Sequence, residues 1–362
     1  MIASISLDLD NKWSYMKTHG DAGWESFPSY FDSVVPRVLN LFDELGITIT
    51  FFVVGQDADR YENHRALRSI ADRGHEIGNH SYHHEPWLHL YSKEKIIEEF
   101  DRSEECIERV TGQKTIGFRG PGFSYSLDVL QVLCDRGYQY DASTFPTFLG
   151  PVARAYYFLH SGLGKKERDQ RNHLFGDWNA GFQRLRPFVW HFNGASLIEV
   201  PVTTMPWFKV PIHLSYVMYL ATFSRLAAAS YFYSALNFCW LNRVQPSLLL
   251  HPLDFMGCDD ETDLSFFPGM SSKAESKMQL ARELLGCAIE QQYGWQRIAS
   301  GGSGTAQLLH QLKRSNGRGK NISPEGVYAF QHKADKILQV VFNRQIVLQQ
   351  LYRVQVLIAL FV

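Results

Sequence analysis

The chain has 362 residues, of which 45% are hydrophobic and 20% are charged, a balance typical of a globular protein. Its net charge of −1 excludes a global electrostatic attraction to nucleic acid or to anionic lipid. The five cysteines are scattered and form no CxxC pair, which excludes a disulfide framework and a thiolate zinc site and favours free thiols. The first residues hold neither a basic segment nor a long apolar run, so we expect no secretion signal and a cytoplasmic location.

The first 145 residues alternate between strand-like and helix-like segments. Short β-branched or alternating segments predict strands at residues 3–8, 47–54, 115–118 and 138–141. Apolar residues at helical spacing, mostly followed by glycine, predict helices at residues 33–45, 62–73, 92–110 and 126–136. This alternation predicts parallel strands with helices outside them, as an open sheet or a barrel.

The alternation of strand-like and helix-like segments ends at about Pro146. Residues 150–195 are basic, aromatic and rich in glycine, which is typical of a long insertion or lid. Late strands are expected at residues 197–202 and 247–250. The apolar segment 216–241 is long enough to span a membrane, but its composition fits an amphipathic or buried helix better, with contact to a membrane surface as the alternative.

These patterns predict one core domain over residues 1–300, with an insertion of loops and apolar helices at residues 146–245. A glycine-rich break follows at residues 301–304. Residues 301–362 form an extension whose last part, 336–362, is apolar on several faces and suits a partner-binding helix. The sequence assigns this extension no role.

Five polar segments each follow an apolar run: Leu7–Asp10, His80–His84, Phe118–Gly122, Tyr140–Ser143 and Leu249–Pro252. In α/β folds, the junctions between strands and the segments that follow them are where sites are built. Together the five segments supply two carboxylates, paired imidazoles, a guanidinium and a late histidine. These groups are typical of a mononuclear metal hydrolase.

Metal ligands are expected in the first two segments. Asp8 and Asp10 lie two apart in a strand and therefore share a face, where they repel unless a cation or an arginine separates them. His80 and His84 are spaced i, i+4, which predicts one helical face and two zinc ligands, although His83 could substitute. Solvated loop acids and a histidine-rich surface loop are the alternatives.

The remaining segments contain groups that could transfer protons or stabilise an oxyanion during catalysis. Arg119 precedes two glycines, and an amide N–H near Gly122 or Phe123 could face a developing oxyanion; a plain turn is the alternative. His251 ends an apolar strand and suits either a proton donor or a core histidine. Asp141 could orient His251 or simply begin the next loop.

These residues resemble the NodB-type polysaccharide deacetylase family, carbohydrate esterase family 4. The resemblance covers roughly residues 2–300 and is strongest from Ile47 to Asp141, in the segments 50–55 and 74–81. It implies a distorted (β/α) barrel, with the long insertion between the fourth and fifth motifs. It also implies metal-dependent removal of an acetyl group from an N-acetylated amino sugar.

The resemblance further implies a role for each matching residue. Asp10, His80 and His84 would hold the metal ion, with Asp8 as the general base. The other implied roles are orientation of the base by Arg119, an oxyanion amide near Gly122, the general acid at His251 tuned by Asp141, and an acetyl pocket lined by Leu249. A set of two histidines and one aspartate suits Zn²⁺ and also admits Co²⁺, Ni²⁺ or Fe²⁺.

Three departures from the family's pattern bear on the substrate. Leu9 separates the two aspartates, so the roles of Asp8 and Asp10 could be exchanged; Gly122 replaces a tyrosine; and Asp141 lacks a following tryptophan. We therefore expect a cytoplasmic sugar intermediate, free or lipid-linked, in place of bulk chitin or peptidoglycan, and no nucleic acid. Peripheral membrane contact is the alternative already given for the apolar segment. The alternatives are an amide hydrolase acting on a ureide or formamide, and an inactive carbohydrate-binding scaffold.

Overall fold

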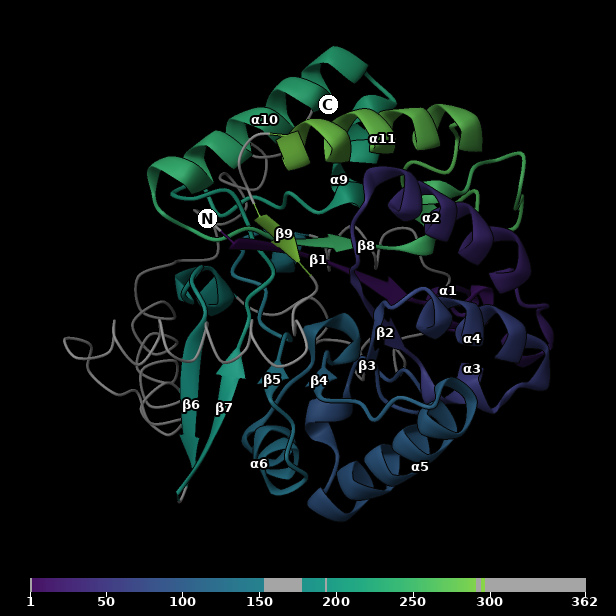
Figure 1. Ribbon diagram of the computed structural model, residues 1–362, viewed down its shortest axis with the longest axis vertical. Helices are drawn as coiled ribbons and strands as arrows, with labels where there is room; N and C mark the ends of the chain where they lie inside the picture. Colours follow the sequence, from purple (N-terminus) through teal and green to yellow (C-terminus); the bar gives the residue numbers. More distant parts are fainter. Residues whose placement is uncertain (1, 153–177, 193, 291–293, 297–362) are drawn as a thin grey trace, which may run out of the picture.

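A computed structural model describes residues 2–152, 178–192, 194–290 and 294–296 of the chain (Figure 1). Its centre is one sheet with the strand order β6-β7-β5-β4-β3-β2-β1-β8, and β9 also pairs with β1. The strands are β1 (Ile2–Leu9), β2 (Thr50–Val53), β3 (Glu76–Asn79), β4 (Gly117–Phe118), β5 (Tyr140–Asp141), β6 (Phe188–Phe192), β7 (Ala195–Glu199), β8 (Ser247–Leu250) and β9 (Gly294–Gln296).

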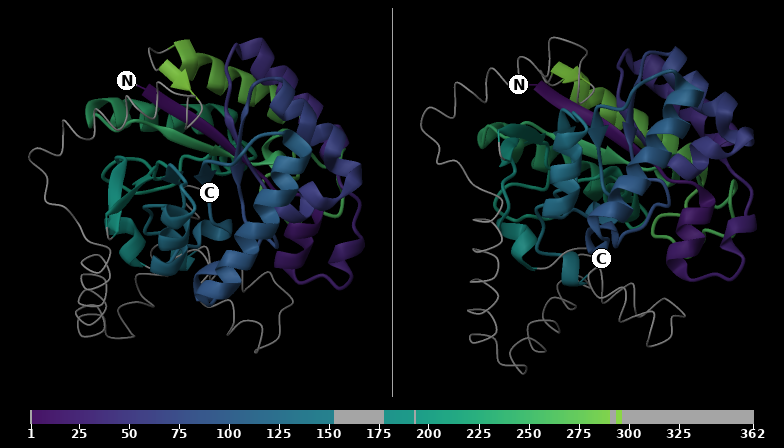
Figure 2. Two further views of the ribbon diagram at one scale, coloured as in Figure 1. Left: turned by 60° about the horizontal axis from the view of Figure 1, so that its bottom comes forward. Right: turned by 90° about the horizontal axis from the view of Figure 1, so that it is seen from below.

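The sheet curls into a distorted, incomplete barrel, which confirms the predicted fold class (Figure 2). Its described strands pair in parallel except for the edge pair β6 and β7, which is antiparallel. The chain just after β7 approaches the start of β8, where the Thr203 amide donates to the Ser247 carbonyl at 3.0 Å. This hydrogen bond joins the segment after β7, near one edge of the sheet, to β8 at the other edge.

Helices cover the outside of the curled sheet (Figure 1). They are α1 (Lys12–His19), α2 (Phe31–Leu45), α3 (Gly55–Asp59), α4 (His64–Asp72), α5 (Lys93–Thr111), α6 (Leu127–Asp135), α9 (Leu214–Ala221), α10 (Arg225–Leu241) and α11 (Ala274–Glu290). Their ends follow local signals. Ser92 caps the start of α5 by accepting from the Lys95 amide, and Gly46 ends α2 in the left-handed conformation, with φ of 66°.

Successive side chains of β1 point alternately to the apolar core outside the sheet and to the polar site inside it. Ile5, Leu7 and Leu9 belong to the large apolar cluster that packs against helices outside the sheet. Ser6 and Asp8 point to the opposite, inner side, because successive strand residues face opposite ways. Asp8, the one ionisable residue of this strand, therefore faces the interior of the curled sheet.

The structure corrects the reading of the middle of the chain. Residues 216–241 do not form one helix; they fall in α9 and α10, separated by residues 222–224. Across the described residues, no helix is both long and apolar enough to cross a bilayer. Strand β6, within the predicted lid, was not anticipated, while residues 153–177 of that lid and 297–362 of the chain lie outside the described residues. The domain boundaries stay predictions.

Candidate active site

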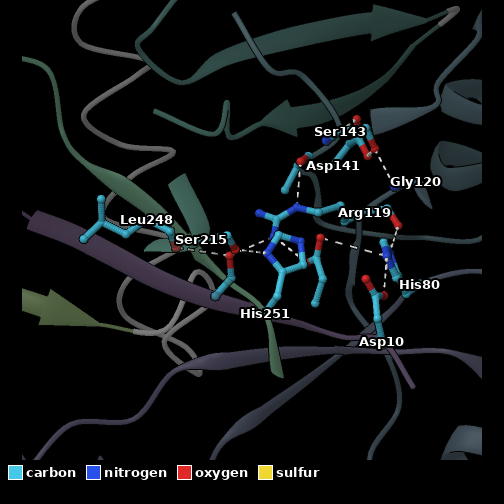
Figure 3. Close-up of polar contacts among 12 residues, drawn as sticks. Asp10, His80, Arg119, Gly120, Asp141, Ser143, Ser215, Leu248 and His251 are labelled. Carbon is cyan, nitrogen blue, oxygen red and sulfur yellow. Dashed lines mark hydrogen bonds and ion pairs between the residues drawn. The ribbon is translucent and has the colours of Figure 1, made fainter. Parts of the chain in front are cut away.

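The polar segments meet at one end of the sheet because their strands run parallel. Leu9 pairs with Val53 and Val53 with Asn79, while Asn79 pairs with Phe118. The residues that follow these strand ends are therefore neighbours in space although they are far apart in sequence. Figure 3 shows Asp10, His80 and Arg119 close to one another, with His251 beside Ser215 and Asp141 beside Ser143.

Three buried side chains form a cluster that could hold a metal ion: Asp10, His80 and His84. The Asp10 Oδ1 lies 3.0 Å from His84 Nε2 and 3.6 Å from His80 Nε2. This oxygen has no hydrogen bond of regular geometry within the described chain, although it is buried. A cation coordinated between the three groups would satisfy it, so the residues fit a divalent metal ion.

The protonation states of the cluster suit metal ligands. Burial alone would raise the pKa of Asp10, but the imidazoles of His84, His80 and His251 lower it to about 2. Burial lowers the pKa of His80 from its ordinary value, which favours the neutral form that a metal ligand requires. Its Nδ1 lies 2.6 Å from the carbonyl oxygen of Arg119, and this contact leaves Nε2 facing the cluster.

The predicted helical face for the two histidines is wrong. His80 and His84 lie on a turn after β3, and the chain reverses because Ser81 and His84 adopt positive φ angles of 59° and 53°. A helix would require negative φ at both residues. The turn still brings the two rings together, with centroids 5.0 Å apart. His83 points elsewhere: its Nδ1 contacts the Glu99 carboxylate at 2.5 Å.

Asp8 is held by a buried arginine. Arg119 is fully buried, and its Nη1 donates to Asp8 Oδ1 at 2.7 Å and to Ser6 Oγ at 2.9 Å. Its Nε donates to the Ala142 carbonyl at 3.0 Å, so the guanidinium is fixed from two sides. The other oxygen of Asp8, Oδ2, lies 3.9 Å from His80 Nε2, next to the metal-ligand cluster.

His251 has a different partner from the one expected. Its Nδ1 lies 3.0 Å from Ser215 Oγ on α9, and its backbone N–H donates to Asp254 at 2.8 Å. Asp141 instead accepts from Ser143 Oγ at 2.6 Å. The prediction that Asp141 tunes His251 is therefore corrected, because this carboxyl faces Ser143 and Glu199 on the neighbouring strand.

Of the two backbone amides proposed to face the oxyanion, only one has no partner within its own turn. Gly122 and Phe123 both have left-handed φ angles, of 58° and 61°. The Phe123 amide donates to the Gly120 carbonyl at 2.9 Å, so it is engaged in the turn, and Gly122 is the remaining candidate. Leu249 is buried on β8, two residues before His251 and in register with Ser6, which places it on the inner side of the sheet.

Sequence reasoning missed two residues that contact this site. Ser215 lies in an apolar segment, where no local pattern distinguishes it. Glu99 could have been noticed, because it falls on the same face of its helix as the apolar Ile96 and Phe100. A carboxylate on the buried face of an amphipathic helix requires a partner.

Comparisons with known proteins found matches in sequence and in fold. The family model described as polysaccharide deacetylase matches residues 20–140, a range that holds His80, His84 and Arg119. The peptidoglycan-N-acetylmuramic acid deacetylase PdaA of Bacillus subtilis is 33% identical over 138 residues, 38% of this chain and 49% of that protein. The peptidoglycan deacetylase of Helicobacter pylori is 29% identical over 109 residues, 30% of this chain and 36% of that protein.

A solved structure extends the likeness of the fold beyond the matched segment. A protein of Mycobacterium smegmatis assigned as a polysaccharide deacetylase superposes with a TM-score of 0.53 at 19% identity, over 87% of this chain and 92% of that one. The chain spans less than half the length of the two curated relatives described above. Residues 20–140 of the chain therefore match the polysaccharide deacetylase family in sequence, and the described structure as a whole shares the fold of the solved neighbour.

Proposed function

We propose that this chain is a metal-dependent hydrolase that removes an N-acetyl group, or a related acyl group, from an amino sugar. The observation that carries the proposal is the convergence of the Asp10, His80 and His84 cluster with the ion pair of Asp8 and Arg119. Amide hydrolysis needs a polarised carbonyl, an activated water and a proton for the leaving amine. The buried groups of this site match those three needs.

The distances and hydrogen bonds around the cluster indicate which side chains would hold the metal ion. We assign Asp10 as the ligand carboxylate because it lies nearer to both histidines than Asp8 does. The Arg119 carbonyl orients His80. A divalent ion bound there would supply Lewis-acid polarisation and lower the pKa of water towards neutrality. Zn²⁺ is the preferred ion for two imidazoles and one carboxylate, with Co²⁺, Ni²⁺ and Fe²⁺ as alternatives.

Asp8 is proposed as the general base and His251 as the general acid. Arg119 fixes one oxygen of Asp8, which leaves Oδ2 beside the cluster to take a proton from the attacking water. Ser215 holds Nδ1 of His251, so Nε2 is the nitrogen available to protonate the leaving amine. The Gly122 amide is proposed to donate to the developing oxyanion.

The substrate is proposed to be an N-acylated amino sugar, lipid-linked, acted on in the cytoplasm with peripheral membrane contact. The rings of Phe123 and Phe145 are stacked beside Gly122, with centroids 4.5 Å apart, and such aromatic surfaces suit the apolar faces of sugar rings. Five free cysteines support a reducing compartment. Recovery of the native chain outside the cell, or activity on exported polymer alone, would contradict this part of the proposal.

The proposal is tested by measuring acetate release from N-acetylated sugar oligomers and from a lipid-linked N-acetylated amino sugar, with Zn²⁺ added. We expect Asp8→Asn to lower kcat by about 10²- to 10⁴-fold, because the base is lost while the shape is kept. Asp43→Asn is the control, since this acid is exposed and pairs with Arg73 away from the site. No acetate release from any of these sugars, or equal rates for the wild type and Asp8→Asn, would refute the proposal.

A further inference from the structure

The turn between His80 and His84 contains two residues in a backbone conformation that L-amino acids rarely adopt. Ser81 has a φ of 59° and His84 a φ of 53°. Such residues keep this conformation only where surrounding groups hold the chain in place. His84 is itself a member of the metal cluster, so whatever fixes the turn also fixes the position of a metal ligand.

Glu99 on α5 supplies several of these contacts from one side chain. Its Oε2 accepts from the backbone amides of Tyr82 and His83, both at 3.0 Å, and its Oε1 contacts His83 Nδ1 at 2.5 Å. The residue is only 3% exposed. Burial raises the pKa of Glu99, but the His83 ring and the two amides outweigh it and hold the pKa below its ordinary value.

Other residues each contact the backbone of the turn at one point, and two of them, Gly55 and Gln56, lie on α3. The Gly55 amide donates to the Ser81 carbonyl at 2.8 Å, the Gln56 amide to the Tyr82 carbonyl at 3.0 Å, and Lys17 Nζ to the His83 carbonyl at 3.0 Å. Glu99 differs from them because it binds two consecutive amides and a side chain at once. A carboxylate that bridges two amides and an imidazole fixes the orientation of the whole peptide segment.

We propose that Glu99 is a positioning residue of the active site, which sets the geometry of the His80–His84 turn and thereby the affinity of the cluster for a divalent cation. Glu99 does not touch the metal ion or the substrate; it acts through His83 and the backbone that leads to His84. His83 is then part of the support and not a ligand. This inference rests on the metal site of the proposed function.

The test is a titration of metal-free protein with Co²⁺ alone, followed by visible absorption, which reports both affinity and ligand geometry. Glu99→Gln keeps the size of the side chain but removes the charge and places an N–H group against donors. We expect Co²⁺ affinity to fall about 10- to 100-fold, with a changed visible spectrum. Glu104→Gln is the matched control, because Glu104 lies on the same helix and binds Arg136 at 2.7 Å, away from the turn. Its Co²⁺ affinity should stay within about twofold of the wild type.

The outcomes separate the inference from the function on which it rests. Wild-type affinity and spectrum in Glu99→Gln would overturn the role of Glu99 while leaving the metal site intact. Failure of the wild type to bind Co²⁺ would refute the metal site itself. Should Glu99→Gln not fold, the same two measurements on His83→Ala test the role of Glu99. This variant removes the contact of Glu99 with the His83 ring and keeps its hydrogen bonds to the amides of residues 82 and 83.

Discussion

Replacement of Arg119 by methionine tests how much the buried ion pair with Asp8 stabilises the fold. Arg119 is 0% exposed and Asp8 5%, with 2.7 Å between Nη1 and Oδ1. Arg119→Met keeps most of the volume but leaves the Asp8 carboxylate buried without its cation, which costs about 3–5 kcal/mol. The Ala142 carbonyl also loses its donor, which adds about 1 kcal/mol. We expect the free energy of unfolding to fall by about 4–6 kcal/mol.

Urea unfolding of the two single variants and the double variant measures this effect. Asp8→Asn removes the uncompensated charge, so the double variant should be more stable than Arg119→Met by about 2–3 kcal/mol. Arg109→Met is the control: its pair with Asp59 is also 2.7 Å long, but the two side chains are 49% and 48% exposed, and we expect a loss below about 1 kcal/mol. The reasoning fails if Arg119→Met costs no more than Arg109→Met, or if adding Asp8→Asn restores nothing.

Three further changes test other parts of the structure. His80→Ala should abolish the binding of about one equivalent of divalent metal, as measured by elemental analysis; retention of the metal would exclude this histidine as a ligand. Ser215→Ala should lower kcat about 5- to 10-fold with KM unchanged, because one hydrogen bond to His251 is lost; an equal kcat in steady-state assays would contradict this. Burial raises the pKa of Asp57 to about 6, against the lowering effect of donors from Asn11 and Trp13. The folded state therefore binds the Asp57 proton more tightly than the unfolded chain does. Protonated Asp57 contributes about 3 kcal/mol to the free energy of unfolding below about pH 4, and this contribution is lost as the pH rises to about 6. Asp57→Asn should flatten this decline in urea unfolding between pH 4 and 6; an unchanged decline would assign it to other groups.

The sequence predicted the parts of the fold in which local pattern and tertiary packing agree. The helix at residues 92–110 has an N-cap serine, an apolar face and a closing glycine, and it appears as α5 with nearly the same bounds. Strands β1 and β8 were equally clear, because β1 alternates apolar with small or polar residues and β8 is a short apolar segment followed by His251. Strand β6 was missed because its aromatic residues do not alternate clearly with polar ones.

Position in the sequence explains why the candidate site residues lie together, but not their detailed geometry. Asp10, His80 and Arg119 each follow the end of a parallel strand and lie close together, next to Asp8 within β1. The conformation of the His80–His84 turn could not be predicted, because no local pattern signals positive φ at Ser81 and His84, and the turn is contacted by α3 and α5, which are distant in sequence. Ser215 could not be assigned to His251 for the same reason: 36 residues separate them in sequence, and only the packing of α9 against β8 joins them.

The position of β1 has a consequence for folding. This strand pairs with β2 near residue 50 but also with β8 near residue 247 and with β9 near residue 294. At a synthesis rate of about 5–20 residues per second, the edge of β1 that faces β8 stays unpaired for about 10–40 s after β2 has emerged. An unpaired apolar strand of this kind is prone to aggregation and to non-native pairing. We therefore expect a late folding step in which β8 docks against β1, and this step brings His251 to the carboxylates of the first ten residues.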